Sequence, residues 1–165
     1  MKSNCIICDL DGVFFDSREW LKYLPQGSEK REDWDNFANH VDLCKPNKPF
    51  IKTLSEVNKV IPTIFVTGRE NTPFLFQKTK KQILRASNLS FTPNINCKLI
   101  MRRMNDYRSA ADVKEEVVKK LLLSYNPIIA IDDESANIEV YQKYKIPTLH
   151  YTKYGDTNDT RKKKN

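Results

Sequence analysis

Residues 5–13 constrain the fold more than any other stretch, because an apolar run leads there directly into two carboxylates. The run Cys-Ile-Ile-Cys barely alternates in polarity, which is typical of a strand that is buried on both faces. Asp9 and Asp11 follow it, and Gly12 ends the run. Residues two apart in a strand point to the same side, so both carboxylates can face one point beyond the strand. That edge is where open α/β sheets bind their ligands.

Two carboxylates that face one point repel each other, and a hard cation is the usual remedy. Mg²⁺ is bound in proteins by one or two carboxylates together with phosphate oxygens and water. A carboxylate in such a place can also act as a nucleophile toward phosphorus. The structural alternative is an ordinary turn, since Asp-Gly is a common turn sequence after a strand.

The rest of the chain alternates apolar runs of strand length with amphipathic segments of helix length. This alternation predicts an α/β fold, a Rossmann-like doubly wound parallel sheet of about five strands with helices on both faces. The expected strands are residues 4–9, 62–67, 98–101, 127–131 and 147–151. The expected helices outside the first connection are residues 49–60, 73–86, 110–123 and 135–144.

The first connection, residues 14–47, is too long for a plain link between a strand and a helix. Scattered aromatic side chains and one short helix, from about Asp33 to Val41, predict a small helical insertion that acts as a partial lid. Residues 153–165 are polar and basic, and this composition predicts disorder. The domain itself is therefore expected to span residues 1–152.

Charge narrows the range of substrates. The formal net charge is +7, and residues 70–109 hold eight basic side chains against two acidic ones. A basic region near acidic site residues indicates an anionic substrate such as nucleic acid, and the alternative is a solvated helix face rich in lysine. The sequence contains neither an apolar run of membrane-helix length nor a signal peptide, so we expect a cytoplasmic protein without membrane attachment. No obligatory protein partner is evident.

The four cysteines are expected to be buried free thiols. Cys5 and Cys8 have the spacing of a redox pair or of half a zinc site. Both lie in the first expected strand, however, where residues three apart face opposite sides. Free thiols also suit a reducing compartment.

Polar residues recur where the expected strands end. Thr67-Gly68-Arg69 follows the second strand, Asp132-Asp133 follows the fourth, and Lys114 lies near the start of the helix after the third. In a doubly wound sheet these ends lie along one edge, so the groups can converge with Asp9 and Asp11. Carboxylates can hold Mg²⁺, a hydroxyl and a backbone N–H can bind phosphate oxygens, and a lysine supplies a positive charge. The set predicts a site for a phosphoryl group.

At these places the chain resembles the haloacid dehalogenase superfamily, over about nine-tenths of its length. The four matching motifs are Asp9-Leu10-Asp11-Gly12-Val13, Phe65-Val66-Thr67-Gly68-Arg69, Lys114 and Ile131-Asp132-Asp133. The second aspartate of the first motif marks the phosphatases of the superfamily, since its dehalogenases lack an acid there. The resemblance therefore implies a phosphatase in which Asp9 is the nucleophile and Asp11 the general acid and base.

The same resemblance implies which residues bind the substrate phosphate and the metal. The implied phosphate ligands are Thr67, Gly68 and Lys114. The implied Mg²⁺ ligands are Asp9, the backbone carbonyl of Asp11, and Asp132, with Asp133 in support.

Further segments resemble the phosphatase domain of phage polynucleotide kinase-phosphatases, a family that removes 3′-phosphates from nucleic-acid ends and nucleotides. These segments are Asp33-Trp34-Asp35-Asn36-Phe37, Ile64-Phe65-Val66-Thr67-Gly68-Arg69, Met101-Arg102, Asp106-Tyr107-Arg108 and Val113-Lys114-Glu115-Glu116. The resemblance implies substrate-binding or supporting roles for Arg18, Arg69, Arg102 and Arg108. The phosphate loop of a kinase, Gly-x-x-x-x-Gly-Lys-Ser/Thr, does not occur in the sequence.

The expected function is that of a Mg²⁺-dependent phosphomonoesterase that forms an aspartyl-phosphate at Asp9. Its expected substrates are nucleic-acid 3′ ends or nucleotides. Two alternatives stay open at this point. One is a 5′(3′)-nucleotidase that acts on free nucleoside or deoxynucleoside monophosphates, and the other is a non-catalytic module that binds nucleic-acid ends.

Overall fold

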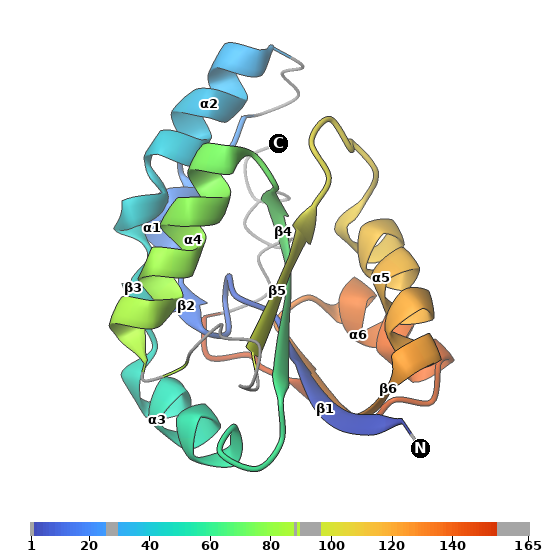
Figure 1. Ribbon diagram of the computed structural model, residues 1–165. Coiled ribbons are helices and arrows are strands. Elements are labelled where there is room, and N and C mark those ends of the chain that lie inside the picture. Colours follow the sequence, from blue (N-terminus) through green and yellow to red (C-terminus); the bar gives the residue numbers. More distant parts are fainter. Residues whose placement is uncertain (1, 26–29, 88, 90–96, 155–165) are drawn as a thin grey trace.

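A five-stranded parallel sheet forms the centre of the molecule (Figure 1). The computed structural model describes residues 2–25, 30–87, 89 and 97–154. The strands of the sheet are β1 (Ser3–Cys8), β4 (Thr63–Glu70), β5 (Cys97–Arg102), β6 (Tyr125–Asp132) and β7 (Thr148–His150). Their order is β5-β4-β1-β6-β7, so β1 is the central strand and β4 and β6 are its neighbours. The prediction of a parallel sheet with five strands is confirmed.

Two layers of helices cover the sheet (Figure 1). One layer contains α3 (Lys48–Val57) and α4 (Pro73–Ala86), and the other contains α5 (Ala110–Ser124) and α6 (Ser135–Lys143). Thr72 caps α4 by accepting a hydrogen bond from Leu75 N, and Ser109 caps α5 by accepting one from Asp112 N. Capping hydroxyls of this kind satisfy backbone donors that a helix start leaves unpaired. All four helices lie within a few residues of their predicted positions.

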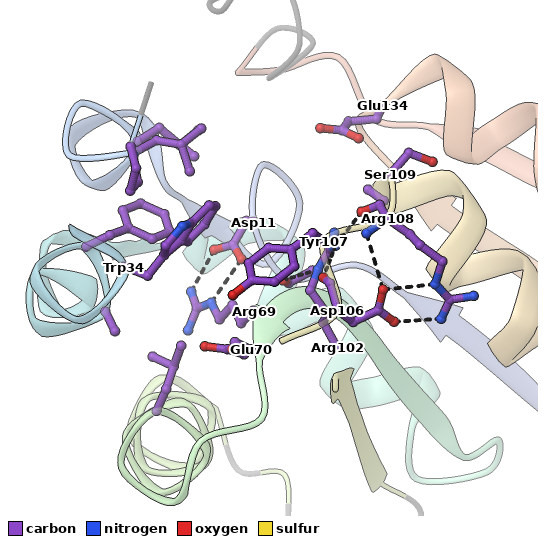
Figure 2. Close-up of a pocket in the computed structure, with 18 of the residues that line it drawn as sticks. Asp11, Trp34, Arg69, Glu70, Arg102, Asp106, Tyr107, Arg108, Ser109 and Glu134 are labelled. Atoms are coloured by element: carbon purple, nitrogen blue, oxygen red, sulfur yellow. Dashed lines mark hydrogen bonds and ion pairs between the residues drawn. The ribbon is translucent and has the colours of Figure 1, made fainter. Parts of the chain in front are cut away.

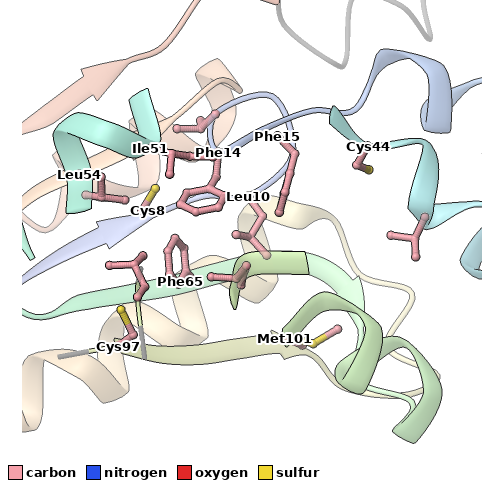
Figure 3. Close-up of a cluster of buried hydrophobic side chains, with 14 of the residues drawn as sticks. Cys8, Leu10, Phe14, Phe15, Cys44, Ile51, Leu54, Phe65, Cys97 and Met101 are labelled. Atoms are coloured by element: carbon pink, nitrogen blue, oxygen red, sulfur yellow. The ribbon is translucent and has the colours of Figure 1, made fainter. Parts of the chain in front are cut away.

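The central strand packs against both layers, as its apolar sequence predicts. Ile6 and Cys8 belong to the core beneath α3 and α4, where Phe14 and Phe65 meet edge to face with their centroids 5.1 Å apart (Figure 3). Cys5 and Ile7 belong to the core beneath α5 and α6. The two cysteines of the C-x-x-C motif thus lie on opposite faces of the sheet. All four cysteines are free and buried, as predicted.

The insertion between β1 and α3 contains short elements. They are β2 (Phe15–Asp16), α1 (Arg18–Leu21), α2 (Arg31–Asn39), the 3₁₀ turn η1 (Val41–Leu43) and β3 (Lys45–Pro46), and β2 pairs with β3 in antiparallel fashion. Trp20 stacks on Phe37 at 4.1 Å between centroids and donates to its carbonyl oxygen, which joins α1 to α2. The predicted helix from Asp33 to Val41 begins two residues earlier and ends two residues earlier.

In Figure 1, α2 lies at the end of the molecule toward which the arrows of β4 and β5 point. The insertion is therefore close to the carboxyl ends of the strands, where the predicted site lies. Most of the predicted basic tail, residues 155–165, lies outside the described residues. None of the helices in the described ranges is long and apolar enough to cross a bilayer.

Candidate active site

The centre of the site lies where β1 and β6 end next to each other. Asp9 directly follows β1, and its backbone N–H donates to the carbonyl oxygen of Ile131 in β6 over 2.9 Å. Asp132 is the last residue of β6. The parallel register, in which Cys8 pairs with Ile131, therefore brings both carboxylates to the same edge of the sheet.

Lys114, near the start of α5, joins these two carboxylates. Its Nζ donates to Asp9 Oδ1 over 2.7 Å and to Asp132 Oδ2 over 2.6 Å, and all three side chains are buried. Two side chains of α6 also hold Asp132, since Asn137 Nδ2 and the Tyr141 hydroxyl donate to it over 2.9 and 3.2 Å. Sequence reasoning missed both, because a polar group on a packed helix leaves no separate signal in the pattern.

Asp133 adds a third carboxylate. One oxygen from each of Asp9, Asp132 and Asp133 lies within 4.8 Å of the others, and we call these three residues together with Lys114 the acid cluster. Asp133 Oδ2 is buried, and it has no hydrogen-bond partner among the described residues. A Cβ at Gly12 would stand only 2.0 Å from this oxygen, and Gly12 has a φ of +90°. Glycine is therefore required at position 12 by both space and backbone conformation.

The charges of the acid cluster do not balance, because three carboxylates face one ammonium group. Burial raises the pKa of Asp133 to about 9, and the neighbouring Asp9 and Asp132 add to this effect. Burial also raises the pKa of Asp9, against the opposing effect of Lys114. For Lys114, burial lowers the pKa, but the facing carboxylates outweigh it and keep the pKa above its usual range. The cluster thus has room for further positive charge.

Asp11 lies in a different environment, although only two residues separate it from Asp9. Arg69 binds its carboxylate with two hydrogen bonds, from Nε to Oδ2 over 2.9 Å and from Nη2 to Oδ1 over 2.6 Å (Figure 2). The hydroxyls of Ser17 and Thr67 donate to the same carboxylate. Burial raises the pKa of Asp11, but Arg69 and the hydroxyls outweigh it and lower the pKa overall. Asp11 is therefore present as a carboxylate, the form that can accept a proton.

Arg69, a predicted substrate-binding or supporting residue, supports Asp11 in this structure. Its side chain is completely buried, and its Nη1 donates to Thr79 and Gln82 of α4. The guanidinium also lies 4.9 Å from the ring centroid of Trp20 in the insertion, a cation–π contact. Arg69 thus connects β4, α4 and the insertion around one catalytic candidate.

Thr67 and Gly68, the predicted phosphate-binding residues of β4, lie next to this pair. The Thr67 hydroxyl donates to Asp11 and accepts from the backbone N–H of Arg69 over 3.2 Å. Gly68 lines the pocket, and its carbonyl oxygen accepts from Arg102 Nε over 3.0 Å. The structure brings both residues to the site, and their role as phosphate ligands stays a prediction.

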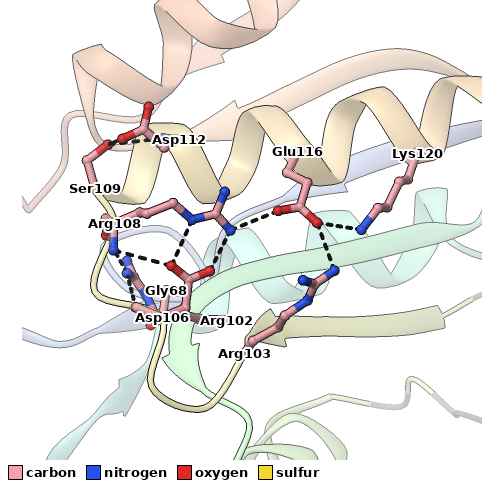
Figure 4. Close-up of polar contacts among 9 residues, drawn as sticks. All are labelled: Gly68, Arg102, Arg103, Asp106, Arg108, Ser109, Asp112, Glu116 and Lys120. Carbon is pink, nitrogen blue, oxygen red and sulfur yellow. Dashed lines mark hydrogen bonds and ion pairs between the residues drawn. The ribbon is translucent and has the colours of Figure 1, made fainter.

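Arg102 and Arg108, the predicted arginines that follow β5, organise a loop rather than a free cationic patch. Arg102 Nη1 donates to the carbonyl oxygens of Asp106 and Arg108 over 2.9 and 2.5 Å (Figure 4). The Arg108 guanidinium binds the carboxylates of Asp106 and Glu116. Both arginines line the pocket, but acids or carbonyl oxygens already contact their guanidinium groups.

Arg18, the remaining predicted arginine, is not brought to the pocket. Its guanidinium binds Asp16, two residues earlier, through two hydrogen bonds of 2.9 and 2.8 Å. It also lies 5.2 Å from the ring centroid of Tyr154, and it is absent from the lining of the pocket. In this structure Arg18 makes a surface contact with Asp16, and its role in substrate binding stays a prediction.

A pocket of about 480 Å³ opens above the acid cluster and the Asp11–Arg69 pair. Trp34 of the insertion lines one side and Tyr107 lines another (Figure 2). Leu21 and Leu24 of the insertion also line the pocket. Sequence reasoning treated Trp34 as a packing residue and gave Tyr107 no role of its own. Trp34 is half-buried and also packs against the core, so its position in the chain carried no separate sign that it lines the pocket.

The fold and the site together define a hydrolase of the haloacid dehalogenase type. Among solved structures, the chain is similar to a haloacid dehalogenase-like hydrolase, SP0104, from Streptococcus pneumoniae, with 14% identity, a TM-score of 0.58, and coverage of 97% of this chain and 90% of that one. It is also similar to the class C acid phosphatase of Bacillus anthracis with tungstate bound, with 15% identity, a TM-score of 0.56, and coverage of 100% and 73%. At these sequence identities, the similarities show only that the folds are alike.

A match in sequence shows the family to which the chain belongs. Residues 3–156 match the phosphatase domain of the polynucleotide kinase PNKP, so the chain belongs to this family of phosphatases. A chain in the Pnkp1/Rnl/Hen1 RNA repair complex is similar in structure, with 21% identity and a TM-score of 0.64 over 94% of this chain. The present chain spans 44% of that chain and 47% of the corresponding chain in a second structure of the complex. No curated protein matches the chain in sequence.

Proposed function

We propose that this phosphatase is a Mg²⁺-dependent phosphomonoesterase that forms an aspartyl-phosphate at Asp9 and removes phosphate from nucleic-acid 3′ ends or nucleotides. The observation that carries the proposal is the convergence of Asp9, Lys114, Asp132 and Asp133, of which all but the fully buried Asp132 line one pocket. The overall reaction converts a phosphate monoester and water into an alcohol and inorganic phosphate.

The acid cluster fits a magnesium ion. Its donors are all carboxylate oxygens, three acids share one lysine, and Asp133 Oδ2 is without a hydrogen-bond partner among the described residues. Asp9, Asp132 and Asp133 would hold the ion, with the carbonyl of Asp11 as a further candidate ligand. When bound, it would neutralise the charge of the phosphate group as the carboxylate approaches.

In the first step, a carboxylate oxygen of Asp9 attacks phosphorus and a P–O bond forms. The bond between phosphorus and the leaving oxygen breaks. Asp11, a carboxylate in the resting site, takes up a proton from solvent and passes it to this oxygen, which leaves as the alcohol. Lys114 contacts Asp9 over 2.7 Å, so it holds the nucleophile in place and supplies positive charge beside the reacting group.

In the second step, water attacks the phosphorus of the aspartyl-phosphate, and the bond to Asp9 breaks. Asp11 accepts a proton from this water. The lowered pKa of Asp11, which results from Arg69 and two hydroxyl donors outweighing burial, favours the carboxylate that this step requires. Arg69 is a positioning residue here, because it fixes both oxygens of Asp11.

The substrate class rests on the family match and on the size of the pocket. Six acidic and five basic side chains line the pocket, so its charge favours one phosphate group near Lys114 over a long polyanion inside it. This balance also supports the second candidate, a nucleotidase that acts on free nucleoside monophosphates. In both cases the reacting group is a terminal phosphate monoester.

The proposal is tested by measuring phosphate release from oligonucleotides and mononucleotides that carry a 3′- or a 5′-phosphate, with Mg²⁺ or with EDTA. We expect release to require Mg²⁺ and to be abolished in Asp9→Asn, while Asp42→Asn, at an exposed aspartate outside the pocket, keeps full activity. Acid quenching during turnover should trap phosphate on the wild-type protein at Asp9. Turnover by Asp9→Asn protein whose mass shows no deamidation would exclude the aspartyl-phosphate route.

A further inference from the structure

The pocket has a second part that the phosphate chemistry does not use. Leu21, Leu24, Pro25 and Trp34 of the insertion contribute apolar surface to it, next to the ionic residues below. A phosphate group and its metal have no use for apolar surface. This part of the pocket is therefore suited to another portion of the substrate.

Tyr107 lies across the pocket from Trp34 (Figure 2). Its side chain is 67% exposed, although the residue lines the pocket. Figure 2 shows it projecting from the loop between β5 and α5 toward the side that Trp34 lines. A ring so exposed contributes little burial to the fold, because hydrophobic stabilisation scales with the area removed from water.

The loop holds Tyr107 in this exposed position. Arg102 donates to the carbonyl oxygens of the two residues that flank Tyr107, Asp106 and Arg108 (Figure 4). The Asp106 carboxylate also accepts from the backbone N–H and from the guanidinium of Arg108. The backbone is thus held on both sides of Tyr107, and a loop that is already ordered loses less entropy when a ligand binds against it.

Glu70, the last residue of β4, links the two sides of the pocket. Its Oε2 accepts from Arg31 of α2 over 2.7 Å, and its Oε1 accepts from the backbone N–H of Asn105 over 2.7 Å. Arg31 lies one turn before Trp34, and Asn105 lies two residues before Tyr107. One carboxylate therefore sets the spacing between the helix that carries Trp34 and the loop that carries Tyr107.

We propose that Trp34 and Tyr107 form the two walls of a slot for a nucleobase, the base of the nucleotide whose phosphate is removed. The proposal rests on the proposed phosphatase function and names the portion of the substrate that this site recognises. Every nucleobase presents a flat π face, so stacking on aromatic rings depends little on sequence. The nearly balanced charges of the pocket agree with recognition by stacking. A volume of about 480 Å³ lies in the range of small-ligand pockets.

The test compares two phosphate esters that differ only in the base, thymidine 3′-monophosphate and 1,2-dideoxyribose 3-phosphate. We expect the wild-type kcat/KM to be higher for the nucleotide. In Tyr107→Ala the ratio of the two kcat/KM values should fall by roughly 5- to 150-fold, the range for one base–aromatic stacking contact. Tyr107→Phe should restore the ratio, and Trp34→Leu, which keeps an apolar contact with Phe37, should lower it like Tyr107→Ala.

Phe74→Ala is the matched control, since Phe74 is an exposed aromatic residue of α4 outside the pocket, and it should leave the ratio unchanged. A wild-type protein that shows no preference for the base in these two esters or in the oligonucleotides described next overturns the slot. A Tyr107→Ala protein that loses the same factor on substrates with and without the base overturns it as well. An oligonucleotide whose terminal 3′-phosphorylated residue has or lacks a base forms a further arm. If the base raises kcat/KM only in the oligonucleotides, the slot binds the base at a nucleic-acid end. If the base also raises kcat/KM in the small esters, a single nucleotide is enough to fill the slot.

If no ester is hydrolysed, the proposed function fails and the slot is tested by binding. Calorimetry with the same two esters then decides. Binding of thymidine 3′-monophosphate that weakens in Tyr107→Ala, with a smaller change for the base-free ester, supports the slot. Equal binding of the two esters to the wild-type protein overturns it.

Discussion

Asp9 and Asp11 are two residues apart on the same strand end, yet they belong to ionic groups of opposite character. Asp9 lies in the acid cluster, where three carboxylates face one lysine. Asp11 lies in a balanced pair, where one arginine and two hydroxyls satisfy one carboxylate. The acid cluster is thus incomplete without further positive charge, whereas the Asp11–Arg69 pair is complete. The difference separates a group arranged for a ligand from a group arranged for stability and position.

The largest expected effect comes from breaking the balanced pair. Arg69→Met leaves the Asp11 carboxylate without its cation, and removal of one partner of a buried ion pair lowers the free energy of unfolding by about 3–5 kcal/mol. Urea unfolding measures this loss. Adding Asp11→Asn to Arg69→Met should recover part of it, because the uncompensated charge is then gone.

Arg103→Met is the matched control for this variant. Arg103 also pairs with an acid, Glu116, but its side chain is 70% exposed. An exposed pair contributes at most about 1 kcal/mol, so this substitution should barely move the urea midpoint. Equal losses in the two variants would contradict the distinction between the buried pair and the surface network.

A smaller effect is expected from completing the acid cluster with metal. Mg²⁺ at about one hundred times its dissociation constant should stabilise the metal-free protein by about 2.7 kcal/mol, through binding to the folded state alone. EDTA should reverse both this stabilisation and the activity. Zn²⁺ should substitute poorly, because the proposed ligands are all oxygens. In Asp133→Asn the midpoint of the Mg²⁺ titration should move to higher concentration, and an unchanged midpoint would remove Asp133 from the metal site.

The two groups should also respond to pH in opposite directions in metal-free protein. The pKa of Asp133 is raised to about 9 by burial and by its acidic neighbours, so the folded state keeps a proton that the unfolded state loses. Stability should therefore fall as pH rises from about 4 toward about 9. Asp133→Asn should flatten this slope.

For Asp11 the sign is reversed, because Arg69 and two hydroxyls outweigh burial and lower its pKa. Its contribution to stability is present above the pKa of an unfolded aspartate, about 3.9, and is lost as pH falls below that value. Asp11→Asn should reduce the loss of stability in acid while leaving the slope above pH 4 in place. Thermal unfolding in EDTA across a range of pH measures the contributions of Asp133 and Asp11 to stability. If stability changed with pH in the same direction for both residues, the contrast between the two groups would be wrong.

Much of the fold and the centre of the site could be predicted because their signals are local. Apolar runs, helix periodicity and polar residues at strand ends place Asp9, Lys114 and Asp132 along one edge before any contact is known. The Asp11–Arg69 pair has a local signal too, since Thr67 and Arg69 are two apart on the neighbouring strand and face Asp11 together. The alternation rule that groups Asp9 with Asp11 therefore applies to this strand as well.

Other features depend on contacts that no local pattern contains. The bidentate pair with Asp16 keeps Arg18 away from the pocket. The exposure of Tyr107 depends on Arg102 reaching two carbonyl oxygens of its loop. The basic segment 70–109 is a similar case, because Arg103 and Arg108 pair with Glu116 of α5. The basic segment expected from the sequence is therefore partly neutralised by Glu116 of α5.

The smallest expected effect concerns three basic residues of α4 within segment 70–109. Lys80, Lys81 and Arg85 do not line the pocket. Replacing all three with glutamine should therefore leave hydrolysis of a mononucleotide unchanged and raise KM only for a longer oligonucleotide, because contacts remote from the phosphate bind ground and transition states alike. The slope of log affinity against log salt should fall by about 0.7 for each single-stranded phosphate contact that is lost. Equal loss on both substrates would place these residues in the site itself. No loss on either would make α4 an ordinary solvated face, and substrate recognition would then depend on the pocket alone.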